Sequence, residues 1–224
     1  MPKRFTKTVS CLATNEEPEQ TRLRHECVRR LARKIQGQFL SFIDPMAGAG
    51  VDAAHFAGVD MTFPQVPTVG GRFGYVNDAD PKCREILQTK FQNVSGYSFF
   101  KAEERAILLG LCKPDLVYLD PNTFTLAKWA KGEYRAELDD SFATAQKFLI
   151  LNDCSYNTLR MGWQRKLYSE ILGVPVHTGD DYLAAAPAFF KKHYPEWDLT
   201  DEEHFFHASP KGNGGTAYLL FRKG

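Results

Sequence analysis

Short apolar segments alternate with amphipathic ones along most of the chain, and this alternation restricts the possible folds more than any other feature of the sequence. Segments rich in β-branched and aromatic residues predict strands, and the stretch after each one repeats its apolar residues with helical spacing. The predicted strands are residues 39–43, 73–77, 97–101, 115–119 and 147–151, and the predicted helices are 21–36, 50–58, 81–93, 103–111, 137–146 and 157–173. This order is typical of an α/β fold with a mainly parallel central sheet.

The end of the chain departs from this alternation. Residues 204–209 and 216–223 predict two strands around the glycine-rich segment 210–215, which indicates an antiparallel β-hairpin at one edge of the sheet. The expected domain organisation is a flexible N-terminal arm (1–20) followed by a single domain (21–224), with insertions near 61–72 and 175–203.

Charge and cysteine content narrow the class of protein. The chain carries 28 basic and 27 acidic residues, so a nucleic-acid surface would have to be a local patch. Its five cysteines are irregularly spaced and form no CxxC motif, which predicts reduced thiols rather than disulfides or a zinc site. We therefore expect the cytoplasm or another reducing intracellular compartment. No apolar run is long enough to predict a membrane span.

Polar residues gather where the predicted strands end. Asp44 closes the first strand, and the glycines of the following turn allow the backbone to approach a ligand closely. The turn opens a helix, whose N-terminus favours an anionic or polar group. The residues of interest in this turn are Asp44, Pro45, Met46, Ala47, Gly48 and Gly50. The spacing also fits a dinucleotide fingerprint, and it fits a turn that merely connects strand to helix.

The second and third strands end in further acids. Asn77 and Asp78 follow the second strand, and a carboxylate there can accept hydrogen bonds from both hydroxyls of a ribose. Asp80 stands directly before Pro81 and is a candidate helix cap. Glu103 follows the third predicted strand, where it could receive an adenine amino group or simply favour the first turn of a helix.

The fourth strand ends in Asp120-Pro121-Asn122, with Phe124 two positions further on. Proline cannot continue a central ladder, so the strand stops there and Asp120 lies at the mouth of the sheet. The carboxylate could serve only to end the strand, since Asp-Pro commonly opens a turn. It could also lie beside the glycine turn, if the first and fourth strands are neighbours.

These three strand ends, in this order, resemble the class I S-adenosylmethionine-dependent methyltransferases. The segment "DPMAGAG" is similar to the turn that holds the methionine moiety in that family, and Asp78 in "NDAD" matches its ribose acid. The segment "LDPNTF" resembles the (Asp/Asn/Ser)-Pro-Pro-(Tyr/Phe) motif of amino-methyltransferases, closest to the Dam-type adenine-N6 enzymes. The resemblance covers about residues 40–124 and implies a Rossmann-like methyltransferase sheet that binds S-adenosylmethionine.

The resemblance also implies a chemistry. Asp120 and a neighbouring carbonyl would accept hydrogen bonds from a target amino group, most plausibly on a DNA or RNA base, while Pro121, Asn122 and Phe124 shape the pocket. In this chain Asn122 replaces the second proline of the motif, and the aromatic Phe124 comes one residue late. Two alternatives stay open: an inactive methyltransferase-like RNA-binding or assembly protein, and a nicotinamide-dependent oxidoreductase.

Other segments could contact a substrate. The predicted helix 21–36 carries six basic residues that could follow a phosphate backbone or form a solvated face. They are Arg22, Arg24, Arg29, Arg30, Arg33 and Lys34. Asn152, Asp153 and Tyr156 follow the fifth strand and could line the substrate site, and Trp129 and Tyr134 could stack on a base. His204 and His207 lack the partners that a metal site requires, so no metal is expected.

Overall fold

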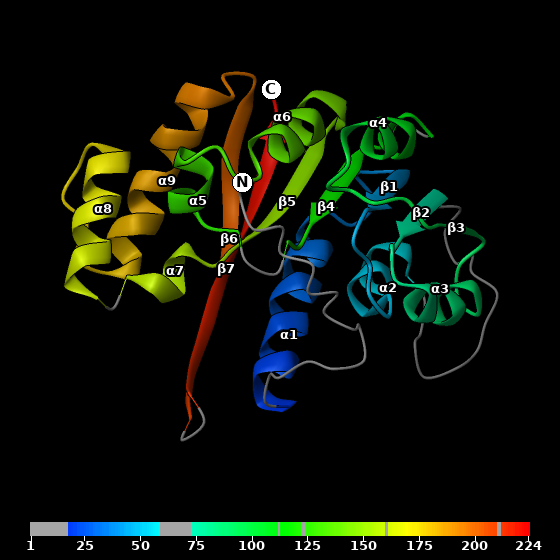
Figure 1. The fold of residues 1–224 in the computed structure, drawn as a ribbon, viewed down its shortest axis with the longest axis horizontal. Coiled ribbons are helices and arrows are strands. Elements are labelled where there is room, and N and C mark those ends of the chain that lie inside the picture. Colours follow the sequence, from blue (N-terminus) through cyan, green and yellow to red (C-terminus); the bar gives the residue numbers. More distant parts are fainter. Residues whose placement is uncertain (1–17, 59–72, 112, 122–123, 160, 210–211) are drawn as a thin grey trace, which may run out of the picture.

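The structure is a computed structural model, and it describes residues 18–58, 73–111, 113–121, 124–159, 161–209 and 212–224. Its strands form one seven-stranded sheet in the order β3-β2-β1-β4-β5-β7-β6 (Figure 1). The strands are β1 (Ser41–Asp44), β2 (Phe73–Asn77), β3 (Asn93–Ser95), β4 (Leu116–Leu119), β5 (Phe148–Asp153), β6 (Trp197–Ser209) and β7 (Gly212–Lys223). The first five strands pair in parallel, and β7 pairs antiparallel with both β5 and β6. The predicted fold class is confirmed, including the antiparallel terminal hairpin.

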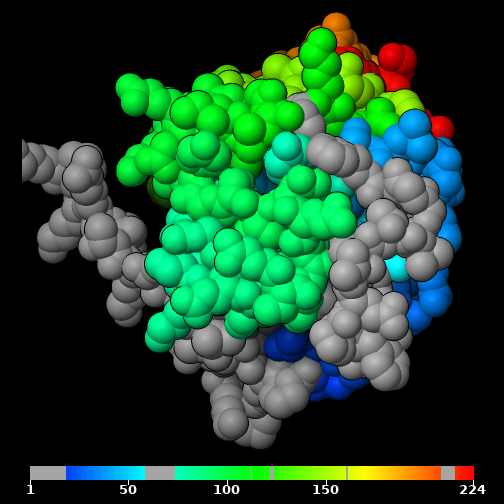
Figure 2. Space-filling view, turned by 90° about the vertical axis from the view of Figure 1, so that its right-hand side faces the viewer, coloured from blue at the N-terminus to red at the C-terminus, as the bar shows by residue number. Residues whose placement is uncertain are grey.

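Nine helices are described around this sheet. They are α1 (Pro18–Lys34), α2 (Val51–Ala57), α3 (Pro81–Gln88), α4 (Ala102–Gly110), α5 (Leu126–Ala130), α6 (Arg135–Thr144), α7 (Ser155–Thr158), α8 (Gly162–Leu172) and α9 (Gly179–His193). The side of the molecule seen in Figure 2 is formed at its centre by the segment from β2 to α4, in cyan-green and green. No helix among the described residues is both long and apolar enough to cross a membrane.

Two apolar cores lie on opposite faces of the sheet. In β4, Leu116 and Tyr118 point into the core under α1 and α2, whereas Val117 and Leu119 point into the core under α4, α6 and α9. Because successive side chains of a strand alternate between faces, a strand buried on both sides must be apolar throughout. This requirement explains the apolar runs of β4 and β5, which the sequence shows as continuous.

The helix α1 completes one of these cores. Its apolar stripe, in which Cys27, Leu31 and Ile35 recur at every fourth position, is buried against the sheet together with Val28. Arg24 lies on the inward side of the helix as well, whereas the other faces carry the remaining basic residues, Arg22, Arg29, Arg30, Arg33 and Lys34. The amphipathic pattern of α1 therefore fixes which of its side chains can reach solvent or other polar groups.

Several predicted elements differ from the observed ones. The third strand was expected at 97–101, but β3 is the three-residue segment Asn93–Ser95, and the aromatic run behind it forms a turn before α4. The helix expected at 157–173 is two helices, α7 and α8, of which α8 is capped by Gly173 in a left-handed conformation. Residues 175–203 contain α9 and the beginning of β6, whereas 61–72 and most of the arm 1–20 lie outside the described residues.

The cysteine prediction is wrong for one residue. Cys27 and Cys154 are free thiols, but Cys83, buried on α3, is disulfide-bonded. Its partner is not among the described residues. Spacing alone could not reveal this pairing, because the sequence contains no short-range cysteine pattern that would bring two thiols within bonding distance.

Candidate functional site at the carboxyl edge of the sheet

The chain order reverses between β1 and β4, and this is where the predicted residues meet. From β1 the sheet continues through β2 and β3 on one side and through β4 and β5 on the other. Ligands of open parallel sheets bind outside the carboxyl ends of the strands at such a switch point. Asp44 ends β1 and Asp120 follows β4, and the pairing of these two strands confirms that they are neighbours.

The turn after β1 depends on its glycines. Gly48 and Gly50 both have positive φ, at 53° and 78°. A Cβ placed on Gly50 would lie 2.7 Å from Leu87 Cδ2 on α3 and 2.7 Å from Phe91 Cε2 just beyond α3, so these side chains would have to shift to admit it. The N–H of Ala47 donates to the carbonyl of Asn77 at 2.9 Å, which ties the turn to the end of β2.

Asp78 closes the glycine turn from the other side. One carboxylate oxygen of Asp78 accepts the N–H of Gly48 at 2.9 Å, and the other accepts the N–H of Asp80 at 2.8 Å. Partial burial raises the pKa of Asp78, although these two N–H groups act in the opposite direction. Asp80 itself accepts the N–H of Lys82 and caps α3, as predicted. Asp78 is therefore the acid that faces the turn.

All the hydrogen-bonding positions of the Asn77 side chain are occupied by groups of the protein itself. Its side-chain amide donates to the carbonyls of Pro45 at 2.9 Å and Tyr97 at 2.8 Å. Its side-chain oxygen accepts the hydroxyl of Ser95 at 2.8 Å and the N–H of Tyr97 at 2.9 Å. Two donors and two lone pairs are all that an asparagine side chain offers. Asn77 therefore holds the ends of β1, β2 and β3 together and leaves ligand contacts to its neighbours.

Asp44 lies in a group of buried acids. Its side chain is 1% exposed and accepts the N–H of Met46 at 3.2 Å. Burial raises its pKa well above the ordinary value, and the negative charges of Asp52, Asp120 and Asp78 raise it further. A cation placed beside these carboxyl groups would relieve this repulsion.

Asp120 is held by donors from three elements. Asn152 of β5 donates to its Oδ1, and Arg24 of α1 donates to its Oδ2 at 2.5 Å. The hydroxyl of Tyr118 lies 3.3 Å from the same Oδ2. A carboxylate offers about four acceptor positions. The contacts among described residues therefore leave Oδ1 with room for one more donor.

Arg24 and its neighbour His25 connect α1 to this group. The Arg24 and Asp120 side chains are 16% and 8% exposed, and Nε of Arg24 also donates to the hydroxyl of Tyr218 at 3.1 Å. Nδ1 of His25 lies 2.7 Å from Asp52 Oδ1. Burial opposes ionisation of Asp52, but the hydrogen bond and charge of His25, with the charge of Arg24, outweigh it and lower its pKa.

The sequence did not reveal this role of α1. Arg24 stands 96 positions from Asp120, and no spacing rule connects residues so far apart. Asp52 and Tyr118 join the same group, and the hydroxyl of Tyr118 donates to Asp52 at 2.9 Å. The one local signal was the position of Asp52 in the first turn of the helix that the glycine turn opens.

Residues at the carboxyl end of β5 support the site from behind. Asn152 is buried, and its side-chain oxygen accepts the hydroxyl of Thr216. Asp153 is buried too, and it accepts the hydroxyl of Tyr182 and the N–H of Ser155. Burial raises the pKa of Asp153 to about 6, despite these donors. Asn152 thus fixes Asp120, whereas Asp153 anchors the helices that follow.

The remaining predicted residues have different surroundings. Phe124 is fully buried, with its ring 6.0 Å from that of Tyr134 in an edge-on arrangement, and its N–H donates to the carbonyl of Pro121 at 2.9 Å. Trp129 is buried on α5. Glu103 is exposed in the first turn of α4. Asn122 lies outside the described residues.

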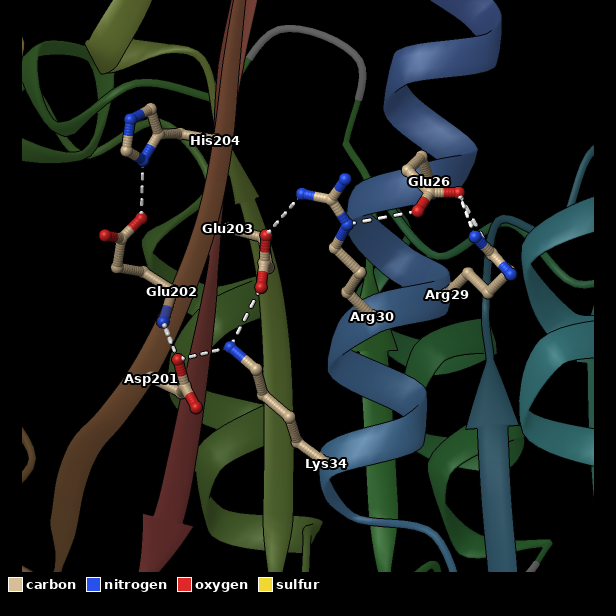
Figure 3. A network of polar contacts seen from close by, with 8 residues as sticks. All are labelled: Glu26, Arg29, Arg30, Lys34, Asp201, Glu202, Glu203 and His204. Carbon is tan, nitrogen blue, oxygen red and sulfur yellow. Dashed lines mark hydrogen bonds and ion pairs between the residues drawn. The ribbon is translucent and has the colours of Figure 1, made fainter.

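The basic residues of α1 are mostly paired within the chain. Figure 3 shows Arg29 and Arg30 bound to Glu26, and Arg30 and Lys34 reaching across to the acids of β6. Lys34 contacts Asp201 at 2.8 Å and Glu203 at 2.9 Å. Arg22 pairs with Glu19. These contacts offset most of the positive charge that the sequence places on this helix.

No group of three or more histidine, cysteine and acidic side chains among the described residues could hold a metal ion. His204 instead pairs with Glu202, with its Nδ1 2.8 Å from Glu202 Oε2.

No protein-family model matches the chain, and no curated protein matches its sequence. Solved structures do match its fold. A magnesium protoporphyrin IX methyltransferase from Synechocystis PCC 6803 with bound SAM has a TM-score of 0.53 at 11% identity, over 96% of this chain and 88% of that one. A candidate RNA methyltransferase from Pyrococcus horikoshii has a TM-score of 0.50 at 12% identity, over 88% and 82%. At these identities the likeness shows the Rossmann-like methyltransferase fold alone.

Proposed function

We propose that this chain is an S-adenosylmethionine-dependent methyltransferase. The observation that carries the proposal is the group of buried carboxyl groups around Asp44, placed at the β1/β4 switch point beside a glycine turn. S-adenosylmethionine carries a sulfonium and an ammonium charge, and the acids there are compensated by Arg24 and His25 only in part. A doubly cationic ligand suits such a site, and matching folds with SAM bound support the same reading.

The residues of the turn would hold the cofactor. Pro45, Met46 and Ala47, with Gly48 and Gly50, would place backbone against the methionine moiety, and Asp44 would face its ammonium group. Asp78 would exchange its bond from Gly48 for the ribose hydroxyls, because a carboxylate accepts two such donors. Asn77 would keep the turn in shape, and Glu103 at the start of α4 would receive the adenine amino group.

The methyl acceptor would be an exocyclic amino group of a DNA or RNA base. Asp120 Oδ1 has room for one further donor, and Pro121 offers a backbone carbonyl beside it. These two oxygens would accept the amino hydrogens and turn the nitrogen lone pair toward the methyl group. When bound, S-adenosylmethionine supplies that methyl in an activated form, so alignment provides most of the rate. Asn122 and Phe124 would shape the wall of the pocket, Phe124 as part of the core behind it.

Two other functions make different demands on the same residues. A nicotinamide-dependent oxidoreductase would bring a diphosphate against the carboxyl groups of Asp44 and Asp52, which repel it. A methyltransferase-like protein without transfer activity is favoured by one observation, the ion pair that already engages Asp120 Oδ2 with Arg24. That protein would bind nucleic acid and transfer nothing.

The deciding experiment follows labelled methyl from S-adenosylmethionine into separate DNA, RNA and protein pools. We expect label in DNA or RNA with the wild-type chain and a loss of at least about 100-fold with Asp120→Ala, the size expected for a group that positions a reactant. Glu103→Ala should instead weaken cofactor binding with little effect on transfer at saturation. Equal transfer by wild type and Asp120→Ala would exclude the proposed role of Asp120. Cofactor binding without transfer into any pool would favour the inactive alternative.

A further inference from the structure

The first turns of α8 display an aromatic and basic surface that the cofactor site does not use. Trp163 is 64% exposed and Met161 58%, which are large fractions for apolar side chains. Arg165 and Lys166 lie on the same turns, and in the described part of the chain neither makes an ion pair. We call Met161, Trp163, Arg165 and Lys166 the Trp163 surface.

This surface contrasts with the helix that carries more basic residues. On α1 the charges of Arg29, Arg30 and Lys34 are matched by acids of α1 and β6. On α8 the described residues offer one acid, Glu170, and it is not paired with either cation. Uncompensated positive charge beside an exposed indole is the combination that binds single-stranded nucleic acid, because bases stack on the ring and phosphates meet the cations.

The Trp163 surface is also tied to the reaction site. The hydroxyl of Tyr168 on α8 donates to Ser155 Oγ at 3.0 Å, and Ser155 opens α7, two residues after the end of β5. Ser155 Oγ in turn accepts the N–H of Leu126 at 2.9 Å, at the start of α5 behind Asp120. Figure 1 shows α7 next to α8 at the lower left, on the side where β4 and β5 end.

We infer that the Trp163 surface binds the single-stranded nucleic acid that flanks the methylated base. Trp163 stacks on a neighbouring base, and Arg165 and Lys166 contact phosphates on either side. This inference deepens the proposed function and rests on it for the nature of the substrate. Binding of nucleic acid at this surface, however, requires no cofactor and can be measured without it.

The test uses intrinsic fluorescence, because the other two tryptophans, Trp129 and Trp197, are buried. An oligothymidine of about 16 nucleotides should quench the emission of the wild-type chain. Trp163→Phe should lose the quenching but keep most of the affinity, measured by anisotropy of a labelled oligonucleotide. Trp163→Ala should weaken binding by about 5- to 150-fold, the range for one lost stacking contact.

Charge reversal tests the phosphate contacts. Arg165→Glu with Lys166→Glu should make the slope of log affinity against log salt shallower by about 1.4, or about 0.7 for each lost contact. Ile107→Ala on α4 and Lys82→Glu on α3 remove comparable exposed groups elsewhere and should change neither affinity nor slope.

Two results would overturn the inference. One is oligonucleotide affinity within twofold of wild type for Trp163→Ala and for the charge reversal. The other is unchanged affinity together with a smaller assembly for Trp163→Ala than for wild type in light scattering, which would make this surface a contact between copies of the chain. Calorimetry of S-adenosylmethionine with Trp163→Ala separates the two proposals. If Trp163→Ala binds both S-adenosylmethionine and the oligonucleotide as the wild type does, this inference is refuted and the proposed function stands. If the wild type itself does not bind S-adenosylmethionine, the proposed function is refuted.

Discussion

Removal of the Arg24 guanidinium should destabilise the protein substantially, because it leaves the Asp120 carboxylate buried without its charged partner. The two side chains are 16% and 8% exposed, with 2.5 Å between Arg24 Nη2 and Asp120 Oδ2. Breaking a buried pair from one side costs about 3–5 kcal/mol. Asn152 still donates to Asp120, so we expect Arg24→Met to lie at the lower end, about 3 kcal/mol.

The pair is measured best by a double-mutant cycle. Asp120→Asn should also be destabilising, since it removes the carboxylate charge that faces the buried Arg24 guanidinium. The double variant Arg24→Met/Asp120→Asn buries no charge, so its loss should fall short of the sum of the singles by roughly 1.5–3 kcal/mol. Urea unfolding, followed by circular dichroism and by tryptophan fluorescence, gives these free energies if both probes coincide.

A matched control lies on the same helix. Arg22 pairs with Glu19 in solvent, with side chains 62% and 47% exposed, and Arg22→Met should leave the unfolding curve unchanged. In thermal unfolding the loss for Arg24→Met corresponds to a fall in Tm of roughly 6–12 °C for a chain of this size. A loss below about 1 kcal/mol, or single losses that simply add, would refute the argument that this pair is buried and coupled.

Three further predictions follow from other groups. Gly50→Ala should lower the free energy of unfolding in urea by roughly 2–4 kcal/mol, because an alanine is strained at a φ of 78° and its Cβ would lie 2.7 Å from Leu87 Cδ2 on α3. Gly173→Ala is the control: its φ is 73° but the space around it is open, so it should cost only about 1 kcal/mol. Burial raises the pKa of Asp153 to about 6, so the contribution of this group to stability is complete below about pH 4 and is lost as pH rises through 6. The loss amounts to roughly 3 kcal/mol, and Asp153→Asn should remove this part of the pH dependence. Burial raises the pKa of Asp44 well above its ordinary value, so binding of a cationic cofactor should release a proton from this group and become tighter as pH rises. Calorimetry in two buffers of different ionisation enthalpy should show the proton release, and Asp44→Asn should abolish it.

Most of the sheet could be predicted because its central strands are buried on both faces and must be apolar. Leu116–Leu119 and Phe148–Asp153 therefore give strong local signals. The edge strand Asn93–Ser95 gives almost none, since it has three half-buried residues, while the apolar run at 97–100 behind it packs as a turn. Apolar content by itself does not separate a short edge strand from a buried turn.

The site also consists of residues that could be predicted from the sequence and residues that could not. Strand-end acids such as Asp44 and Asp120 could be placed on one edge from the sequence, because a parallel sheet brings the carboxyl ends of its strands together. The partners of those acids could not be predicted. The pairing of Arg24 with Asp120 and of Lys34 with Glu203 joins residues 96 and 169 positions apart, and it depends on where α1 packs.

The measurement that tests the central claim most directly is calorimetric titration of the wild-type chain with S-adenosylmethionine, with a reduced nicotinamide dinucleotide as the comparison ligand. The account predicts one bound S-adenosylmethionine per chain, weakened at least about tenfold by Asp78→Ala because the ribose loses two hydrogen bonds, and no binding of the dinucleotide. Binding of the dinucleotide without S-adenosylmethionine, or the same affinity in wild type and Asp78→Ala, would contradict it.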